Sequence, residues 1–162
     1  MNWDKATDLM VYSALATVAV LGVMGVYQWI SRKSFKKIDK SLLALLVPLV
    51  LVVVTWFIFD YVFVLNTRPD GTGEPSFPST HTMITATVFF CTAILLPKYI
   101  KQKYLLILLD FIMFLFVILV PIGRVIANKH WTSDVIGGLI FAAIYTGAYF
   151  ATFKLITKGD QK

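Results

Sequence analysis

The feature that most constrains this chain is a series of five long apolar stretches separated by short polar connections. They cover residues 9–30, 42–65, 81–96, 104–122 and 133–156. A helix needs about 20 mostly apolar residues to cross a bilayer, and each stretch meets or nearly meets that length. Backbone polar groups inside a bilayer are best satisfied within helices. We therefore expect an all-α integral membrane bundle of about five transmembrane helices, formed as a single domain over residues 1–162.

The composition agrees with a membrane protein and argues against a nucleic-acid-binding protein, which the positive net charge alone would suggest. Hydrophobic residues make up 58% of the chain and charged residues 15%, which is too little polar surface to cover a soluble core. The net charge of +6 comes from Lys and Arg gathered between the apolar stretches, so we expect no nucleic-acid partner. The single cysteine, Cys91, lies in an apolar stretch and is interpreted as a small buried residue.

The distribution of cations predicts which end of the bundle faces the cytoplasm. If the chain crosses five times, the N-terminus and the second and fourth connections share one side, which carries four of the 15 Lys and Arg residues. The other side carries eleven. Cations favour the cytoplasmic side, so we expect the N-terminus outside, the C-terminus in the cytoplasm and a location in the plasma membrane.

Residues suited to phosphate chemistry fall on the expected outer side: Arg68, His81, Arg124 and His130. Ser79 or Thr80 is a good N-cap for the helix that follows, and a helix N-terminus can bind an anion. His81 would then lie beside that anion and could protonate a leaving group. The alternative is a helix cap with an ordinary interfacial histidine.

His130 and Asp134 are four residues apart at the start of the last apolar stretch. If a helix starts near Trp131, the Asp134 carboxylate could reach the imidazole, fix its tautomer and raise its nucleophilicity. The alternative is an interfacial His-Trp pair with Asp134 as a helix cap. Arg68 offers a forked donor pair for phosphate, although interfacial arginines are common.

Three segments in this order carry a resemblance to a known family: Arg68-Pro69, Pro78-Ser79-Thr80-His81, and Arg124 with five residues to His130 and three more to Asp134. Their order and spacing closely resemble the type 2 phosphatidic acid phosphatase (PAP2) superfamily. The contexts of residues 76–82 and 130–135 are also similar to that family.

The resemblance implies three catalytic residues. His130 would be the nucleophile and carry the phosphoryl group as a phosphohistidine. Asp134 would orient and activate it. His81 would protonate the leaving lipid oxygen and later help to activate water.

The resemblance also implies the groups that hold the phosphate. Arg68, Arg124 and Ser79 would bind the phosphoryl oxygens, helped by backbone N–H groups near Thr80. Phosphoryl transfer depends on positioned cations more than on bond-making by the protein. The family uses no metal, so we expect no metal or other cofactor.

The sequence departs from the family pattern in three ways. Tyr61 stands where the first family motif has a lysine, seven residues before Arg68, and Lys129 is a candidate substitute. Gly123 stands where serine is common. Many membrane members have six helices, and this sequence predicts five. The missing lysine bears on rate and substrate range more than on the type of reaction.

These features predict a metal-independent lipid phosphate or pyrophosphate phosphatase at the outer membrane interface, with membrane lipids as its surroundings. A polyprenyl (undecaprenyl-type) pyrophosphate is the first candidate substrate, followed by phosphatidic acid, phosphatidylglycerol phosphate and a lipid A phosphate. Two alternatives remain open: a phosphotransferase between lipids, and a catalytically weakened protein that binds anionic lipid.

A few residues within the apolar stretches invite other interpretations. Asp60, near the outer interface, is expected to pair with a site arginine, and Asp110 is expected to have a structural role. Gly137, Gly138 and Gly147 are expected to permit close helix packing.

Overall fold

The structure, a computed structural model, describes residues 2–159. Its helical elements are α1 (Trp3–Arg32), η1 (Phe35–Lys37), α2 (Lys40–Leu43), α3 (Leu46–Phe57), η2 (Ile58–Val62), α4 (Thr80–Leu95), η3 (Leu96–Lys98), α5 (Lys103–Ile126) and α6 (Thr132–Gly159). Within residues 2–159, five helical segments are long and apolar enough to cross a bilayer. The predicted all-α membrane bundle is therefore confirmed.

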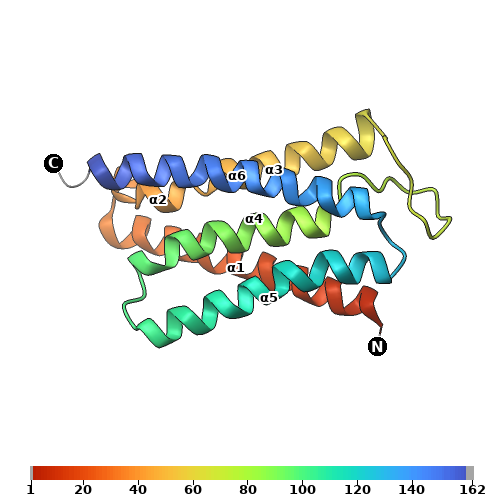
Figure 1. The fold of residues 1–162 in the computed structure, drawn as a ribbon. Helices are drawn as coiled ribbons and strands as arrows, with labels where there is room; N and C mark the ends of the chain where they lie inside the picture. The colour runs from red at the N-terminus through yellow and green to blue at the C-terminus, as the bar shows by residue number, and fades with distance from the viewer. Residues whose placement is uncertain (1, 160–162) are drawn as a thin grey trace.

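Helix α4 lies at the centre of the bundle, with α1, α3, α5 and α6 packed against it (Figure 1). In the apolar stretch that begins with α4, 56% of the residues are buried, whereas the corresponding shares are 11% in α1 and 17% in α5. Met83, Phe89 and Leu95 of α4 are buried in the core, whereas α1, α3 and α5 leave many large apolar side chains exposed. In a membrane protein such exposed apolar faces contact lipid. The polar start of α4 is thus held in the middle of the bundle.

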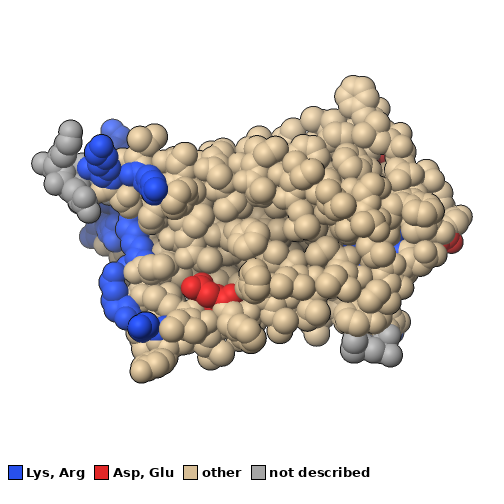
Figure 2. Space-filling model, in the orientation of Figure 1, with Lys and Arg blue, Asp and Glu red and all other residues tan. Residues whose placement is uncertain are grey.

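The polar connections gather at two opposite ends of the bundle (Figure 1). The site end holds the start of α1 together with the connections 63–79 and 127–131. The basic end holds the end of α6 and the connections 33–39 and 99–102, and Figure 2 shows Lys and Arg side chains gathered there. The grouping of connections expected from five crossings is therefore correct. Which end faces the cytoplasm stays a prediction.

Two helices extend beyond their apolar stretches at the site end. Helix α1 begins at Trp3, six residues before the predicted start at residue 9, because the Asn2 side chain accepts a hydrogen bond from the Lys5 N–H at 3.3 Å and caps it. Helix α5 continues past the predicted end at residue 122 to Ile126, so Arg124 lies in its last turn and not in a loop. Hydropathy misses these turns because charged residues interrupt the apolar run, at Asp4, Lys5 and Asp8 in α1 and at Arg124 in α5.

Two adjacent glycines allow α6 to approach the start of α4 closely, as predicted. A Cβ atom on Gly138 would lie 2.8 Å from the Ser79 carbonyl oxygen, and one on Gly137 would lie 2.4 Å from the Phe77 ring. The prediction for Gly147 is wrong, because a Cβ there would meet nothing within 4 Å. The glycine pair therefore positions the residues that precede and begin α4.

We expect Gly138→Ala to destabilise the fold by about 1–3 kcal/mol, because the added methyl group collides with backbone that cannot rotate away. Gly147→Ala is the matched control in the same helix, and it should be neutral or slightly stabilising since alanine favours the helix. Thermal unfolding of both variants in detergent measures the difference. Equal melting temperatures would contradict the close approach of α6 to Ser79.

Candidate active site

The loop before α4 folds into a short hairpin. Thr67 and Pro75 form an antiparallel bridge, the Arg68 N–H donates to the Glu74 carbonyl at 2.9 Å, and the Ser76 N–H donates to the Asn66 carbonyl at 3.0 Å. The tip reverses through two glycines with positive φ, at residues 71 and 73, where only glycine is unstrained. This hairpin places Arg68 opposite Glu74 and Ser76 opposite Asn66.

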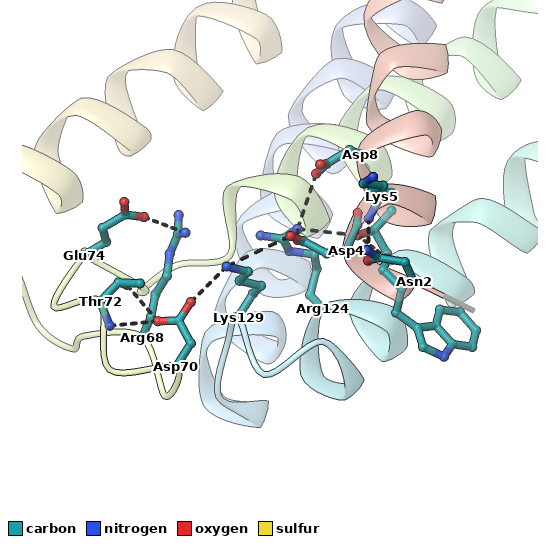
Figure 3. Close-up of polar contacts among 12 residues, drawn as sticks. Asn2, Asp4, Lys5, Asp8, Arg68, Asp70, Thr72, Glu74, Arg124 and Lys129 are labelled. Atoms are coloured by element: carbon teal, nitrogen blue, oxygen red, sulfur yellow. Dashed lines mark hydrogen bonds and ion pairs between the residues drawn. The ribbon is translucent and has the colours of Figure 1, made fainter.

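The hairpin is bound to the connection between α5 and α6. The Trp131 indole N–H donates to the Thr67 carbonyl at 2.8 Å, and Lys129 Nζ lies 3.0 Å from Asp70 Oδ2. Hydrogen bonds from Thr72, followed by the one from Lys129, hold the pKa of Asp70 well below its usual range, so its carboxylate stays charged. Figure 3 shows Asp70 between Thr72 and Lys129. The two loops expected to form one site are therefore in contact.

His130 is buried between these loops, with 5% of its side chain exposed. Its Nδ1 lies 2.8 Å from the Ser76 carbonyl oxygen. A carbonyl oxygen only accepts, so the imidazole donates from Nδ1–H and its Nε2 carries a lone pair when the ring is neutral. Burial, followed by the Arg124 guanidinium, lowers the pKa of His130 to about 4. The ring is therefore neutral at pH 7.

Asp134 lies next to His130 but is not its hydrogen-bond partner. Asp134 Oδ2 is 3.8 Å from His130 Nδ1 and instead accepts the Trp131 backbone N–H at 2.9 Å. Asn66 Nδ2 approaches Oδ1 at 3.4 Å. The carboxylate is fully buried and caps α6, which was the alternative from sequence. The expected direct contact is replaced by the Ser76 carbonyl, which sequence could not place beside residue 130.

His81, in the first turn of α4, contacts a carboxylate that was not predicted from the sequence. Its Nε2 lies 2.9 Å from Oδ1 of Asp8, which is in the second turn of α1. The His81 side chain is 28% exposed. The two histidines are therefore held by different partners, one by a backbone carbonyl and the other by a carboxylate.

Arg124 is the most deeply buried cation of the site, with 3% of its side chain exposed. Its Nη1 donates to Asp4 Oδ1 at 2.7 Å and lies 3.4 Å from Asp8 Oδ1 (Figure 3). Its Nε atom is buried and has no hydrogen-bond partner among the described residues. Nη1 of the guanidinium is thus paired with α1, while the buried Nε has no acceptor among the described residues.

Arg68 repeats this pattern in the hairpin. Its Nη1 pairs with Glu74 Oε2 at 2.6 Å (Figure 3), and its buried Nε also has no partner within residues 2–159. An unpaired buried donor is costly, so two of them in one site suit an anion that accepts from both. Phosphate oxygens match the guanidinium fork well.

Ser79 and Thr80 differ in what they can offer an anion. Ser79 is fully buried, its N–H donates to the Asp134 carbonyl at 2.9 Å, and its hydroxyl lies 3.1 Å from the Thr82 hydroxyl. Thr80 is half-buried and is the first residue of α4. N–H groups in the first turn of a helix have no intrahelical acceptor. The structure therefore ties the Ser79 backbone to α6 and leaves the first turn of α4 available.

The candidate substitute for the missing family lysine lies within the site. Lys129 is 25% exposed and lies 4.0 Å from Asp4 as well as 3.0 Å from Asp70. Tyr61 is exposed and stacks on the Phe57 ring. Lys129 therefore adds positive charge from another loop, whereas the residue at the family lysine position points elsewhere.

Other acidic residues behave differently from expectation. Asp60 forms no ion pair with a described residue, since Arg68 is paired with Glu74 instead, so the expected pairing is wrong. Asp110 is exposed on α5 and likewise has no ion pair within residues 2–159. Asp4 and Asp8 were missed, although an asparagine cap followed by two acids four apart is a signal for an earlier helix start.

Within residues 2–159, no group of three or more His, Cys, Asp or Glu side chains is placed to hold a metal ion. The expectation of a metal-free site stays a prediction.

Comparisons with known proteins identify a family and a similar fold. Residues 58–158 match the model of the PAP2 superfamily. The fold is similar to that of a Bacillus subtilis protein described as the first transmembrane PAP2 type phosphatidylglycerolphosphate phosphatase, with a TM-score of 0.62 and 22% identity. The match covers 97% of this chain and 76% of that chain. A comparison with curated proteins found no match.

The tautomer of His130 can be tested without any assay of activity. The chain has two histidines, so His81→Gln leaves His130 as the only imidazole. We expect its ring to carry the proton on Nδ1 and to become charged only near pH 4, because burial disfavours the imidazolium. The 15N chemical shifts of the ring during an acid titration measure both. A midpoint near 6.5, the ordinary value, or a proton on Nε2 would contradict the geometry.

Proposed function

This chain belongs to the PAP2 superfamily, and from that premise we propose that it is a membrane phosphatase that removes a phosphoryl group from a lipid. The observation that carries the proposal is the tautomer and the protonation state of His130. Its Nδ1–H is held by the Ser76 carbonyl and its pKa is low. A neutral imidazole with a free Nε2 lone pair is a competent nucleophile at neutral pH.

The reaction proceeds in two balanced steps. His130 Nε2 forms a bond to phosphorus while the bond from phosphorus to the lipid oxygen breaks, and that oxygen takes a proton from His81. Water then attacks the phosphohistidine and gives a proton to His81, while the N–P bond breaks and returns its electron pair to Nε2. A lipid phosphomonoester gives the lipid alcohol and inorganic phosphate, whereas a lipid pyrophosphate gives the lipid monophosphate and inorganic phosphate. Both histidines regain their starting states.

Positive charge for the transferred phosphoryl group comes from arginine side chains. Arg68 and Arg124 each have a buried Nε without a partner among the described residues, and the N–H groups at the start of α4 lie in the same region. Such preorganised donors stabilise the charge spread over the phosphoryl oxygens. Asp134 has an indirect part in this scheme, since it caps the helix that follows His130.

A lipid suits the position of this site better than a soluble phosphate ester. Phe63, Val64 and Leu65, directly before the hairpin, are exposed apolar residues, so the site lies close to the membrane interface. The headgroup can enter the site while the tails stay in the bilayer. We favour a polyprenyl pyrophosphate. Phosphatidylglycerol phosphate is the second candidate, because the similar Bacillus subtilis protein is described as acting on it.

The site end faces the outside of the plasma membrane in this proposal. The cations gathered at the basic end (Figure 2) support a cytoplasmic position for that end. The start of α1 then lies outside and the end of α6 inside.

We expect purified protein to release inorganic phosphate from a lipid phosphate, with chelator present, and His130→Ala to lower the rate by at least about 1,000-fold. A panel of polyprenyl pyrophosphate, phosphatidic acid, phosphatidylglycerol phosphate and lipid A phosphate identifies the substrate. Lys36→Ala, at the opposite end, is the control and should keep full activity. If the phosphate appears only on an acceptor lipid, the protein is a phosphotransferase and not a hydrolase. If no substrate is turned over, the proposed function is wrong.

Orientation is testable with single cysteines. Cys91 is buried and should not react, whereas Thr72 and Lys36 are exposed at opposite ends of the bundle. We expect Thr72→Cys to react with a membrane-impermeant maleimide in intact cells, and Lys36→Cys only after permeabilisation. The reverse pattern would place the site in the cytoplasm.

A further inference from the structure

The geometry points to Asp8 as a positioning residue that holds His81 in the orientation needed to protonate the leaving lipid oxygen. This inference rests on the proposed phosphatase function. Asp8 lies in α1, and the family match begins only at residue 58. The role is therefore assigned from contacts within this chain and not from the family pattern.

The contact between Asp8 and His81 defines which imidazole nitrogen faces the substrate. Asp8 Oδ1 lies 2.9 Å from His81 Nε2. An ionised carboxylate only accepts, so Nε2 carries the proton. Nδ1 is then the nitrogen left to exchange a proton with substrate or water. A carboxylate that fixes the tautomer and ring orientation of a histidine is a common device for acid–base chemistry.

Helix α1 is held firmly enough for this purpose. Gly123 of α5 leaves the space that α1 fills, since a Cβ there would lie 2.5 Å from Thr7 Cγ2 and 3.0 Å from the Trp3 ring. Thr7 is fully buried. The pairing of Asp4 with the buried Arg124 at 2.7 Å adds a charged contact between the same two helices (Figure 3). Asp8, one turn after Asp4, is thereby set beside the start of α4.

The two acids of α1 divide their contacts. Asp4 pairs with Arg124 and approaches Lys129 at 4.0 Å. Asp8 contacts His81, and the same Oδ1 atom lies 3.4 Å from Arg124 Nη1. Asp8 thus connects the residue proposed to protonate the leaving group with a residue proposed to bind the phosphate. Asp4 connects only with the phosphate-binding side, which makes it a matched control.

The test compares two substrates that differ in their need for protonation. A lipid alkoxide is a poor leaving group, whereas p-nitrophenolate is stable near neutral pH. We expect Asp8→Ala to lower kcat for a lipid phosphomonoester such as phosphatidylglycerol phosphate, whose leaving group is an alkoxide, about 10- to 100-fold. This loss is smaller than the full contribution of general acid catalysis, about 100- to 10,000-fold, because the variant misplaces His81 but does not remove it. We expect its kcat for p-nitrophenyl phosphate to change less than about threefold. Asp8→Asn keeps the shape of the side chain and should show the same selectivity, and His81→Gln should reproduce it.

Double variants and a control variant distinguish a positioning role of Asp8 from general damage to the site. Adding Asp8→Ala to His81→Gln should cause no further loss, because both act on one proton transfer. Asp4→Ala should slow both substrates by a similar factor, since Asp4 contacts Arg124 and Lys129 but makes no ion pair with His81 within residues 2–159. Equal losses with both substrates for Asp8→Ala and Asp8→Asn, or no loss with either, would overturn the role of Asp8.

A second measurement separates this inference from the proposed function. In His130→Gln protein His81 is the only imidazole, and we expect its 15N shifts to report a proton on Nε2. Adding Asp8→Ala should shift the tautomer ratio towards Nδ1–H. An unchanged ratio would overturn the positioning role even if the enzyme is active. A changed ratio, combined with wild-type protein that hydrolyses neither substrate, would support the contact and overturn the phosphatase function instead.

Discussion

The hydrogen bond from His130 Nδ1–H to the Ser76 carbonyl joins the two loops on which the site depends. It buries the imidazole, fixes its tautomer and holds the hairpin against the start of α6. The contacts of Trp131 with Thr67 and of Lys129 with Asp70 reinforce the same junction. Together these contacts hold the loop that carries Arg68 against the loop that carries His130.

Charge balance explains how so many cations can gather beside the membrane interface. Arg124 pairs with Asp4, Arg68 with Glu74, and Lys129 with Asp70 (Figure 3). Each partner neutralises one edge of its cation. For both arginines the buried Nε is left without an acceptor among the described residues. The ion pairs avoid the cost of uncompensated buried charge, and the unpaired Nε atoms are the donors that the proposed function assigns to a phosphate.

Helix packing gives the site its precision. Gly138 lets the Ser79 carbonyl approach α6, and Gly123 gives α1 room beside α5. The first places the start of α4, which carries His81, and the second places Asp8 against it. Small residues in transmembrane helices therefore position residues of the candidate site, although they take no part in the proposed reaction.

The sequence by itself determined the five spans, the grouping of the polar connections into two ends, and the candidate site residues that meet at one of them. Hydropathy and motif spacing are local properties, and they were sufficient for those conclusions. Only the tertiary structure decided the partner of each residue. Ser76 and not Asp134 holds His130, Glu74 and not Asp60 holds Arg68, and Asp8 holds His81. The His130 and His81 contacts join residues 54 and 73 positions apart, and local periodicity cannot specify contacts of that range. Polar helix ends such as the first turns of α1 are also invisible to hydropathy, because they lie beyond the apolar run that defines a span.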